Sequence, residues 1–212
     1  MSSFDTLLFD LDGTLIDSLA DLTTSINLLR DEQDLPPLDR PTVASYVGDG
    51  ASLLVRRALP EGFYRSRHLE RFMAIYAEHL SDATAPFPGI IPFLEACRDK
   101  ALAVVTNKPI APTLELLERL ELRRFFPVVV GGDSAPTKKP DPGPVRLALS
   151  QLGRPPAGAV MIGDHVNDLL AGRAAGTLTC FCAWGTGDRR DAPYDLEAAA
   201  PADLGRLFLC DA

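Results

Sequence analysis

The 212-residue sequence lacks any apolar run long enough to cross a membrane, and its amino terminus lacks a basic region followed by an apolar segment. A membrane-spanning helix needs about 20 mostly apolar residues, and a secretory signal needs both of the missing amino-terminal parts. With 46% hydrophobic and 24% charged residues, the composition is that of a globular protein. We therefore expect no membrane partner and a cytoplasmic location.

Cysteine and basic residues are also scarce. The cysteines Cys97, Cys180, Cys182 and Cys210 form no CxxC pair and no metal-binding spacing with histidine, so we expect reduced thiols. Lys and Arg number 21 against 29 Asp and Glu, for a formal net charge of −8. Because binding to a phosphate backbone needs clustered cations, we expect no nucleic-acid partner. A small anionic substrate is not excluded, since one local cation can hold a phosphate.

The sequence does contain an alternation of short apolar runs with amphipathic segments. The runs are apolar almost throughout, which favours parallel strands covered on both faces, and they span residues 6–9, 102–106, 128–130, 159–163 and 178–183. Helical spacing of apolar residues separates them at 90–98, 112–120, 145–152 and 168–175. This order predicts an α/β fold with a Rossmann-like open parallel sheet.

Residues 18–84 break this rhythm and form a predicted helical insertion. The segment has no convincing strand, and its helical patterns cover 19–30, 41–47, 51–59 and 64–80. Pro36-Pro37 and the Gly48-Asp49-Gly50 loop interrupt it. We expect a small α-helical cap at 18–84 and a core made of 1–17 and 85–212, with a linker at 85–89.

Polar residues follow the predicted strands where each one ends. They are Asp10, Asp12, Thr106, Lys139, Asp164 and Asp168. In an open parallel sheet, ligands bind at the carboxyl ends of the strands where the strand order reverses. We therefore expect these residues, although distant in sequence, to meet in one crevice.

Asp10 and Asp12 are candidates for nucleophilic and acid–base chemistry. A carboxylate can attack phosphorus directly and form an aspartyl-phosphate, which divides one difficult hydrolysis into two easier steps. The carboxyl group of Asp12 could protonate the leaving alcohol and later accept a proton from water. Gly13 permits the tight turn that brings backbone N–H groups toward a phosphate.

Asp164 and Asp168 lie four residues apart, on one side of a helix start. Together with Asp10 they form a set of hard oxygen ligands suited to Mg²⁺. We expect Asp164 to be a direct ligand and Asp168 to act indirectly or through water.

Two further segments offer groups for binding phosphate. Thr106 and Asn107 end a strand and open a helix, where a hydroxyl and free N–H groups can hold an anion. One lysine of Lys138-Lys139 is expected to complement the phosphate and the carboxylates, and the other to be solvated. The residue types alone do not decide between the two.

In this order, the residues resemble the four motifs of the haloacid dehalogenase-like hydrolase superfamily. The matching segments are 9–15, Thr106-Asn107, Lys139-Pro140, and Gly163-Asp164 with Asp168. The insertion after the first motif is similar to that superfamily's type 1 cap. The resemblance selects Lys139 over Lys138, because the motif lysine directly precedes proline. It also implies that the Asp12 backbone carbonyl binds Mg²⁺ while the Asp12 side chain transfers protons.

Finer details are similar to the phosphoglycolate phosphatases, at residues 46–51, 105–109 and 130–133. This resemblance implies hydrolysis of 2-phosphoglycolate to glycolate and phosphate. The substrate carboxylate needs a cation, and Arg56 or Arg57 are the candidates. We expect these arginines and the nearby Gly48-Asp49-Gly50 loop to select the substrate. Asp141 departs from the family pattern, since relatives often carry histidine there.

Several alternatives stay open. The substrate could be another small phosphorylated metabolite, such as a sugar phosphate, or the enzyme could be a phosphomutase similar to β-phosphoglucomutase. Dehalogenation is disfavoured by the acid at Asp12. A phospho-accepting signalling module uses similar residues, but the large helical insertion argues against it. A catalytically inactive scaffold is disfavoured because this sequence has every motif residue. The oligomeric state, monomer or homodimer, is left undecided.

Overall fold

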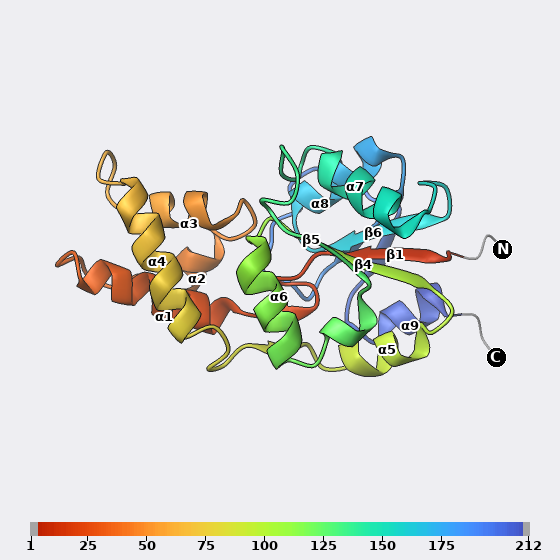
Figure 1. The fold of residues 1–212 in the computed structure, drawn as a ribbon, viewed down its shortest axis with the longest axis horizontal. Coiled ribbons are helices and arrows are strands. Elements are labelled where there is room, and N and C mark those ends of the chain that lie inside the picture. Colours follow the sequence, from red (N-terminus) through yellow and green to blue (C-terminus); the bar gives the residue numbers. More distant parts are fainter. Residues whose placement is uncertain (1–3, 210–212) are drawn as a thin grey trace.

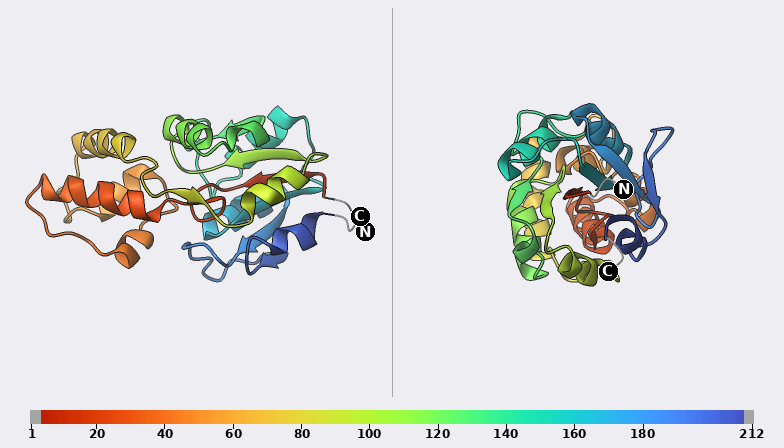
Figure 2. Two further views of the ribbon diagram at one scale, coloured as in Figure 1. Left: turned by 90° about the horizontal axis from the view of Figure 1, so that it is seen from below. Right: turned by 90° about the vertical axis from the view of Figure 1, so that its right-hand side faces the viewer.

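A computed structural model describes residues 4–209 and shows an α/β core with a helical lobe at one end (Figures 1 and 2). The core holds six parallel strands in the order β5-β4-β1-β6-β7-β8. Their bounds are β1 Thr6–Phe9, β4 Ala101–Val105, β5 Val128–Val130, β6 Ala159–Gly163, β7 Leu178–Cys182 and β8 Leu196–Ala198. The predicted open parallel sheet is confirmed.

The sixth strand, β8, was not predicted from the sequence. It has three residues at the edge of the sheet and lies in an alanine-rich stretch without an apolar run. Its pairing with β7, such as Cys182 with Ala198, depends on tertiary contacts that local sequence does not encode.

Helices cover both faces of the sheet, and successive residues of β1 point to opposite sides. Leu8 belongs to the core cluster beneath α7 (Gly143–Leu152) and α8 (Val166–Ala175). Leu7 and Phe9 belong to the cluster shared with α5 (Ile90–Ala96), α6 (Ile110–Arg119) and α9 (Asp203–Phe208). All three β1 side chains are fully buried, as the continuous apolar pattern predicts.

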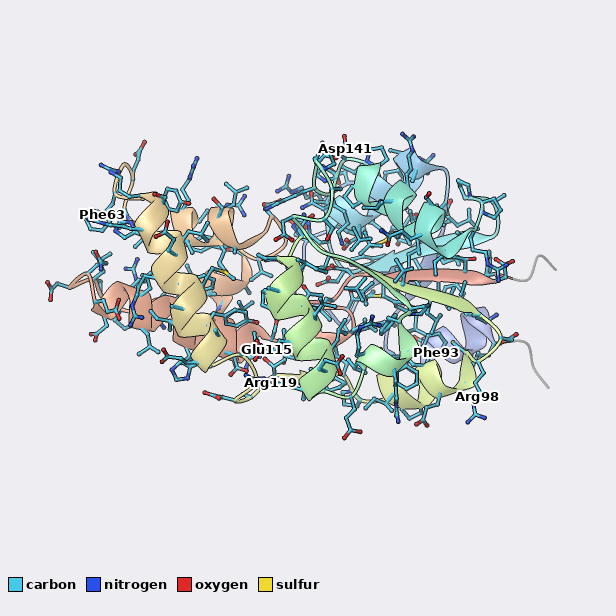
Figure 3. The ribbon with its side chains drawn as sticks, in the orientation of Figure 1. Phe63, Phe93, Arg98, Glu115, Arg119 and Asp141 are labelled. Carbon is cyan, nitrogen blue, oxygen red and sulfur yellow. The ribbon has the colours of Figure 1, made fainter. Side chains whose placement is uncertain are left out.

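Aromatic contacts extend the packing around β1. The ring of Phe9 meets Phe93 of α5 (labelled in Figure 3) edge-on at 6.3 Å and Phe126 at 6.0 Å. Phe126 directly follows a 3-10 turn, Arg123–Phe125. Cys97, Cys180 and Cys182 are buried free thiols, whereas Cys210 lies outside the described residues. No helix within residues 4–209 combines the length and apolar character needed to span a membrane.

The lobe at one end consists of four helices. They are α1 (Leu19–Asp31), α2 (Arg40–Ala44), α3 (Ala51–Arg57) and α4 (Ser66–Glu78). Leu22, Ile26 and Leu29 of α1 recur at helical spacing and are buried. Asp39 caps α2, because its carboxylate accepts a hydrogen bond from the Thr42 N–H at 2.9 Å. Shorter than predicted, α2 ends at Ala44, and turns lead from it to the 48–50 loop.

Two short antiparallel strands join the lobe to the core. β2 (Ile16–Asp17) pairs with β3 (Ala85–Pro86), so the chain enters and leaves the lobe side by side. β3 lies within the segment predicted as a linker. The division into a core of 1–17 and 85–212 and a cap of 18–84 stays a prediction that these paired strands support.

Asp21 of α1 anchors the segment by which the chain leaves the lobe. Its buried carboxylate accepts hydrogen bonds from the Ala83 N–H at 3.0 Å and from the N–H and hydroxyl of Thr84 at 2.8 and 2.6 Å. On the core side, Arg119 of α6 pairs with Glu115 and donates to Ser81 Oγ at 3.1 Å (Figure 3). The return path is therefore fixed mainly by one buried acid.

We predict that Asp21→Ala lowers the free energy of unfolding by about 3 kcal/mol, since it leaves buried donors of Ala83 and Thr84 without an acceptor. Urea unfolding followed by circular dichroism measures the change. The control is Asp31→Ala at the exposed end of the same helix, expected to change stability by less than about 0.5 kcal/mol. Equal effects of the two substitutions would contradict the anchoring role.

Candidate active site

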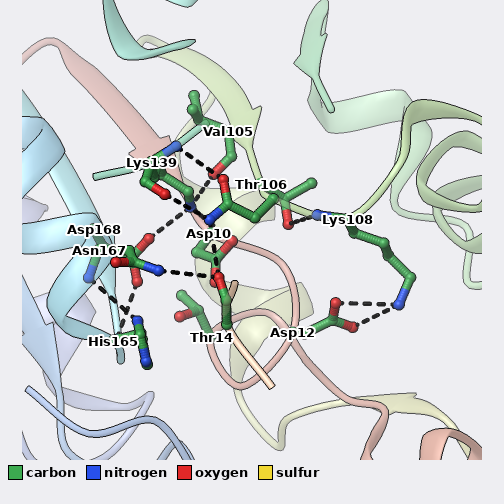
Figure 4. Close-up of polar contacts among 12 residues, drawn as sticks. Asp10, Asp12, Thr14, Val105, Thr106, Lys108, Lys139, His165, Asn167 and Asp168 are labelled. Atoms are coloured by element: carbon green, nitrogen blue, oxygen red, sulfur yellow. Dashed lines mark hydrogen bonds and ion pairs between the residues drawn. The ribbon is translucent and has the colours of Figure 1, made fainter. Parts of the chain in front are cut away.

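The sequence-predicted polar residues gather where β1, β4 and β6 end (Figure 4). The strand order reverses at β1, whose neighbours are β4 and β6. Asp10 directly follows β1, and its N–H donates to the Ile162 carbonyl at 2.9 Å. Thr106 follows β4 in the same manner, donating to the Val130 carbonyl at 2.9 Å. The switch point of the sheet therefore holds the candidate nucleophile.

Gly13 allows the turn after β1 to approach Asp164. Its φ of +85° lies in the left-handed region, and a Cβ there would stand 2.2 Å from Asp164 Oδ2. Thr14, the next residue, donates its hydroxyl to Asp164 Oδ1 at 3.2 Å. Only glycine satisfies both the backbone angle and the space at this position.

Lys139 lies between two carboxylates in the buried centre of the site. Its Nζ is 2.9 Å from Asp10 Oδ1 and 2.6 Å from Asp168 Oδ1, and it also donates to the Val105 carbonyl. Burial alone would lower the pKa of Lys139, but Asp10 and Asp168 raise it above its ordinary value. Lys138, by contrast, is exposed, so the geometry favours the lysine that precedes proline.

Three carboxylates, Asp10, Asp164 and Asp168, form a buried cluster. One oxygen from each lies within 4.8 Å of the other two. Burial and the nearby charge of Asp168 raise the pKa of Asp10 to about 6, although Lys139 opposes the shift. Burial, then Asp10 and Asp168, raise the pKa of Asp164 to about 8. When ionised, the three carboxyl groups therefore carry more negative charge than the one ammonium of Lys139 can neutralise.

The side chains of Asp168 and His165 each accept a backbone N–H at the amino terminus of α8. Asp168 Oδ2 accepts the His165 N–H at 3.0 Å, and His165 Nδ1 accepts the Asn167 N–H at 3.2 Å. Both oxygens of Asp168 thus have protein partners, one of them Lys139. Asp164 has Thr14 and the Gly187 N–H, at 2.8 Å, as its partners.

Lys108 is a site residue that the sequence interpretation missed. Its buried Nζ lies 3.0 and 3.1 Å from the two oxygens of Asp12, which also accepts a hydrogen bond from Ser18 Oγ at 2.6 Å. The signal was present, because Lys108 follows the same strand end as Thr106. The cations predicted for the site are Lys138 or Lys139 for phosphate and Arg56 or Arg57 for the substrate carboxylate.

Thr106 and Asn107 have different local partners. The hydroxyl of Thr106 accepts the Lys108 N–H at 3.2 Å, which tightens the turn before α6. Asn107 was predicted to bind phosphate, yet its side chain is engaged with protein. Its Nδ2 donates to the Gly48 and Lys139 carbonyls at 2.9 and 2.8 Å, and its Oδ1 accepts the Lys139 N–H. The Asn107 side chain therefore positions Lys139 and the cap loop.

The cap loop 48–50 lies against the core. Gly48 and Gly50 have φ values of +112° and +88°, and a Cβ on Gly48 would stand 2.9 Å from the His165 ring. Asn167 Nδ2 donates to Asp49 Oδ1 at 2.7 Å and to the Gly48 carbonyl at 3.2 Å. Close packing and these hydrogen bonds hold the cap over the crevice.

Arg56 and Arg57, the predicted cations for substrate, lie elsewhere. Arg56 stacks over the ring of Tyr64 at 5.1 Å, and Arg57 pairs with Asp49 at 2.6 Å. Both side chains are exposed, and neither lines the cavity between cap and core. Their expected contact with substrate stays a prediction, which this geometry does not support.

Asp141, the departure from the family pattern, also lies outside the crevice (Figure 3). It is exposed, and its Oδ1 accepts the Gly143 N–H and the Thr137 hydroxyl, both at 2.8 Å. These contacts stabilise the turn that begins α7.

A cavity that is partly open to solvent lies between the cap and Asp10. Asp10, Asp12, Thr106 and Lys108 form its polar floor. Its apolar wall comes mainly from the cap, through Leu22, Val47, Leu54, Phe72, Met73 and Tyr76. A small molecule in this cavity would contact Asp10 beneath the cap.

The comparisons with known proteins agree with this geometry. The family model described as haloacid dehalogenase-like hydrolase matches residues 7–182. The chain belongs to the haloacid dehalogenase-like hydrolase family. It is 38% identical over 213 residues to a phosphoglycolate phosphatase of Chromobacterium violaceum, with 94% of each chain covered. It is 37% identical to one of Aquifex aeolicus, with 95% of each covered.

Solved structures of family members share the whole fold. A structure described as a predicted phosphoglycolate phosphatase from Haemophilus somnus superposes with a TM-score of 0.90 at 29% identity, covering 98% of this chain and 99% of that one. One described as a putative phosphoglycolate phosphatase from Lactobacillus delbrueckii gives 0.89 at 26% identity, covering 99% and 100%. The predicted family and its hydrolase class are confirmed.

We predict that Lys139→Ala lowers the free energy of unfolding by about 3–5 kcal/mol at neutral pH, because buried Asp10 and Asp168 lose their counter-charge. Urea unfolding measures this. Lys138→Ala, which removes an exposed neighbour of the same type, should change stability by less than about 0.5 kcal/mol. A mild effect at position 139 would show that the carboxylates are compensated in some other way.

A second prediction concerns pH in the absence of divalent cations. Folded Asp10 and Asp164 keep their protons up to about pH 6 and about pH 8, whereas unfolded aspartates ionise near about 3.9. Between these values the unfolded state binds fewer protons, so the contribution of both groups to stability falls as pH rises from about 4 to about 8.

Urea unfolding in EDTA across this range tests the prediction. Subtracting the curve of Asp164→Asn isolates the contribution of Asp164, which should decline toward pH 8. A divalent cation should stabilise the native chain more at pH 8 than at pH 5, since it binds ionised carboxylates. A difference curve that is flat or rises with pH would contradict the assignment.

Proposed function

We propose that this phosphoric monoester hydrolase cleaves a small phosphorylated acid, with 2-phosphoglycolate as the best candidate, through an aspartyl-phosphate on Asp10. The observation that carries the proposal is the position of Asp10 at the switch point of the sheet. There Asp10 lines the cavity beneath the cap, contacts Lys139 and lies near Asp12. The names of the Chromobacterium and Aquifex relatives support the choice of substrate.

The chemistry divides between Asp10 and Asp12. A carboxylate oxygen of Asp10 attacks phosphorus, the bond from phosphorus to the ester oxygen breaks, and the Asp12 carboxyl gives its proton to the leaving oxygen. Water then attacks phosphorus, Asp12 takes a proton from that water, and the bond from Asp10 to phosphorus breaks. Inorganic phosphate leaves, Asp10 is again a carboxylate, and Asp12 again carries the one proton with which it began.

Other residues prepare this chemistry. The ammonium of Lys139, paired with Asp10, can balance negative charge on the transferring phosphoryl group. Thr106, at the end of β4, offers its hydroxyl to the same region. The cap covers the crevice, so Asp10 is only 8% exposed. Such burial favours hydrolysis of an enclosed small ester over service as an exposed phospho-acceptor of a signalling module.

The carboxylate cluster fits Mg²⁺. Three acids with oxygens within 4.8 Å of one another, and only Lys139 as a counter-charge, make a hard oxygen site that a divalent cation would neutralise. Asp10 and Asp164 would bind it directly with the Asp12 carbonyl. Asp168, one oxygen of which accepts from the Lys139 ammonium and the other from the His165 N–H, would act indirectly. When bound, Mg²⁺ supplies Lewis-acid stabilisation of phosphoryl oxygens.

Composition supports the remaining expectations, which stay proposals: a cytoplasmic location, no nucleic-acid or membrane partner, and a monomer or homodimer. A phosphomutase differs from a phosphatase only in the acceptor. Release of inorganic phosphate in the absence of a sugar acceptor therefore separates the two activities.

We predict that Asp10→Asn removes phosphate release from 2-phosphoglycolate, by about 10⁴-fold or more, because the amide is no nucleophile. The protein should remain folded, since the two side chains have the same shape. Phosphate release with and without Mg²⁺, and thermal unfolding of each variant, are the measurements.

The control is Asp5→Asn, an exposed acid before the opposite end of β1, which should keep full activity. Substantial turnover by purified Asp10→Asn would rule out Asp10 as the nucleophile.

A further inference from the structure

Lys108 gives the cavity a cation that the phosphoryl-transfer chemistry does not require. Its side chain is 5% exposed and lies on the cavity floor, on the opposite side of Asp12 from the carboxylate cluster (Figure 4). The Nζ of Lys108 lies 3.0 and 3.1 Å from the two carboxylate oxygens of Asp12, so it forms an ion pair as an ammonium. This charge has Asp12 as its ion-pair partner and retains donor capacity.

Tyr76 of the cap faces the same place. Lys108 Nζ lies over its ring, 4.6 Å from the centroid. Tyr76 is 2% exposed, and its hydroxyl is the one buried side-chain nitrogen or oxygen within residues 4–209 that has no hydrogen-bond partner. Leaving such a group unsatisfied costs free energy. A ligand in the cavity that Tyr76 lines could satisfy it.

The rest of the cap wall limits what that ligand can be. Leu22, Val47, Leu54, Phe72 and Met73 offer no hydrogen bonds from their side chains to a row of hydroxyl groups. A sugar phosphate would therefore bury its hydroxyls without partners on the cap side. One ammonium and one hydroxyl, both donors, instead suit a single small anionic acceptor group.

We propose that Lys108 and Tyr76 form a subsite for the carboxylate of a short phosphorylated acid, and so select the substrate. This inference rests on the proposed function, since it assigns the far end of the molecule whose phosphate is held beside Asp10. Lys108 comes from the core and Tyr76 from the cap helix α4. The subsite is therefore complete only when the cap lies over the core, as in this structure.

The subsite also takes over the role that Arg56 and Arg57 do not fill. Both arginines lie outside the cavity, whereas Lys108 and Tyr76 line it. Within the cavity wall, Lys108 is the side chain with a permanent positive charge.

The test compares two esters of nearly equal size, 2-phosphoglycolate and 2-hydroxyethyl phosphate, which differ in the carboxylate. We expect Tyr76→Phe to lower the ratio of their kcat/KM values by about tenfold and Lys108→Met by about 10–100-fold. If Lys108 or Tyr76 merely positioned Asp12, its substitution would lower kcat/KM for both esters by the same factor and leave their ratio unaltered.

Binding to the Asp10→Asn chain, measured by titration calorimetry, supplies a readout independent of turnover. In that background, Tyr76→Phe should raise the dissociation constant of 2-phosphoglycolate by about tenfold and leave that of 2-hydroxyethyl phosphate unchanged. Tyr64→Phe is the matched control, because its hydroxyl contacts Ser52 and its ring lies outside the cavity. Tyr64→Phe should change the dissociation constant of neither ester.

The two proposals fail in different ways. If the native chain with Mg²⁺ releases phosphate from neither ester, the proposed function is wrong. The subsite is then tested by calorimetry alone, through the effect of Tyr76→Phe on the binding of the two esters. If the native chain hydrolyses 2-phosphoglycolate but Tyr76→Phe and Lys108→Met keep both the kinetic ratio and the binding preference, the subsite is wrong.

Discussion

The structure depends on one buried interaction, the contact of Lys139 with both Asp10 and Asp168. Without this ammonium, acids at the ends of β1 and at the start of α8 would repel one another in a region with little water. Lys139 is in turn fixed by Asn107, which accepts its N–H and donates to its carbonyl. The same asparagine donates to Gly48 of the cap. Charge balance and cap placement are therefore connected through a single side chain.

The charges of the site form two neighbouring groups with different chemistry. Lys139 with Asp10, Asp164 and Asp168 makes an acid-rich group suited to a metal ion and a phosphate. Lys108 with Asp12 makes a balanced pair next to the apolar wall of the cap. Asp12 lines the same cavity as Asp10.

Much of the core was predictable because it follows from local patterns. Apolar runs gave strands such as Thr6–Phe9 and Ala159–Gly163 with the bounds that the structure has. Motif order identified the strand-end residues, because the carboxyl ends of parallel strands meet at one edge. Strand β8 was not predictable in this way, since three residues at a sheet edge are specified by their neighbour β7 and not by their own composition.

The cap contacts were harder to predict from the sequence for a physical reason. Which face of α3 points to the crevice depends on how the cap sits on the core, and spacing along the helix does not contain that information. Arg56 and Arg57 are near the 48–50 loop in the sequence, yet they lie outside the cavity. Tyr76 meets Lys108 across 32 positions of sequence, and their pairing exists only once cap and core are assembled.

The central claim is that Asp10 carries the phosphoryl group during turnover. The most direct measurement is mass spectrometry of peptides from enzyme quenched in acid while it hydrolyses 2-phosphoglycolate with Mg²⁺. The account predicts a phosphoryl group on the peptide that contains Asp10, and on that residue alone. A phosphoryl group on another residue, or phosphate release at full rate without any phosphoenzyme, would contradict it.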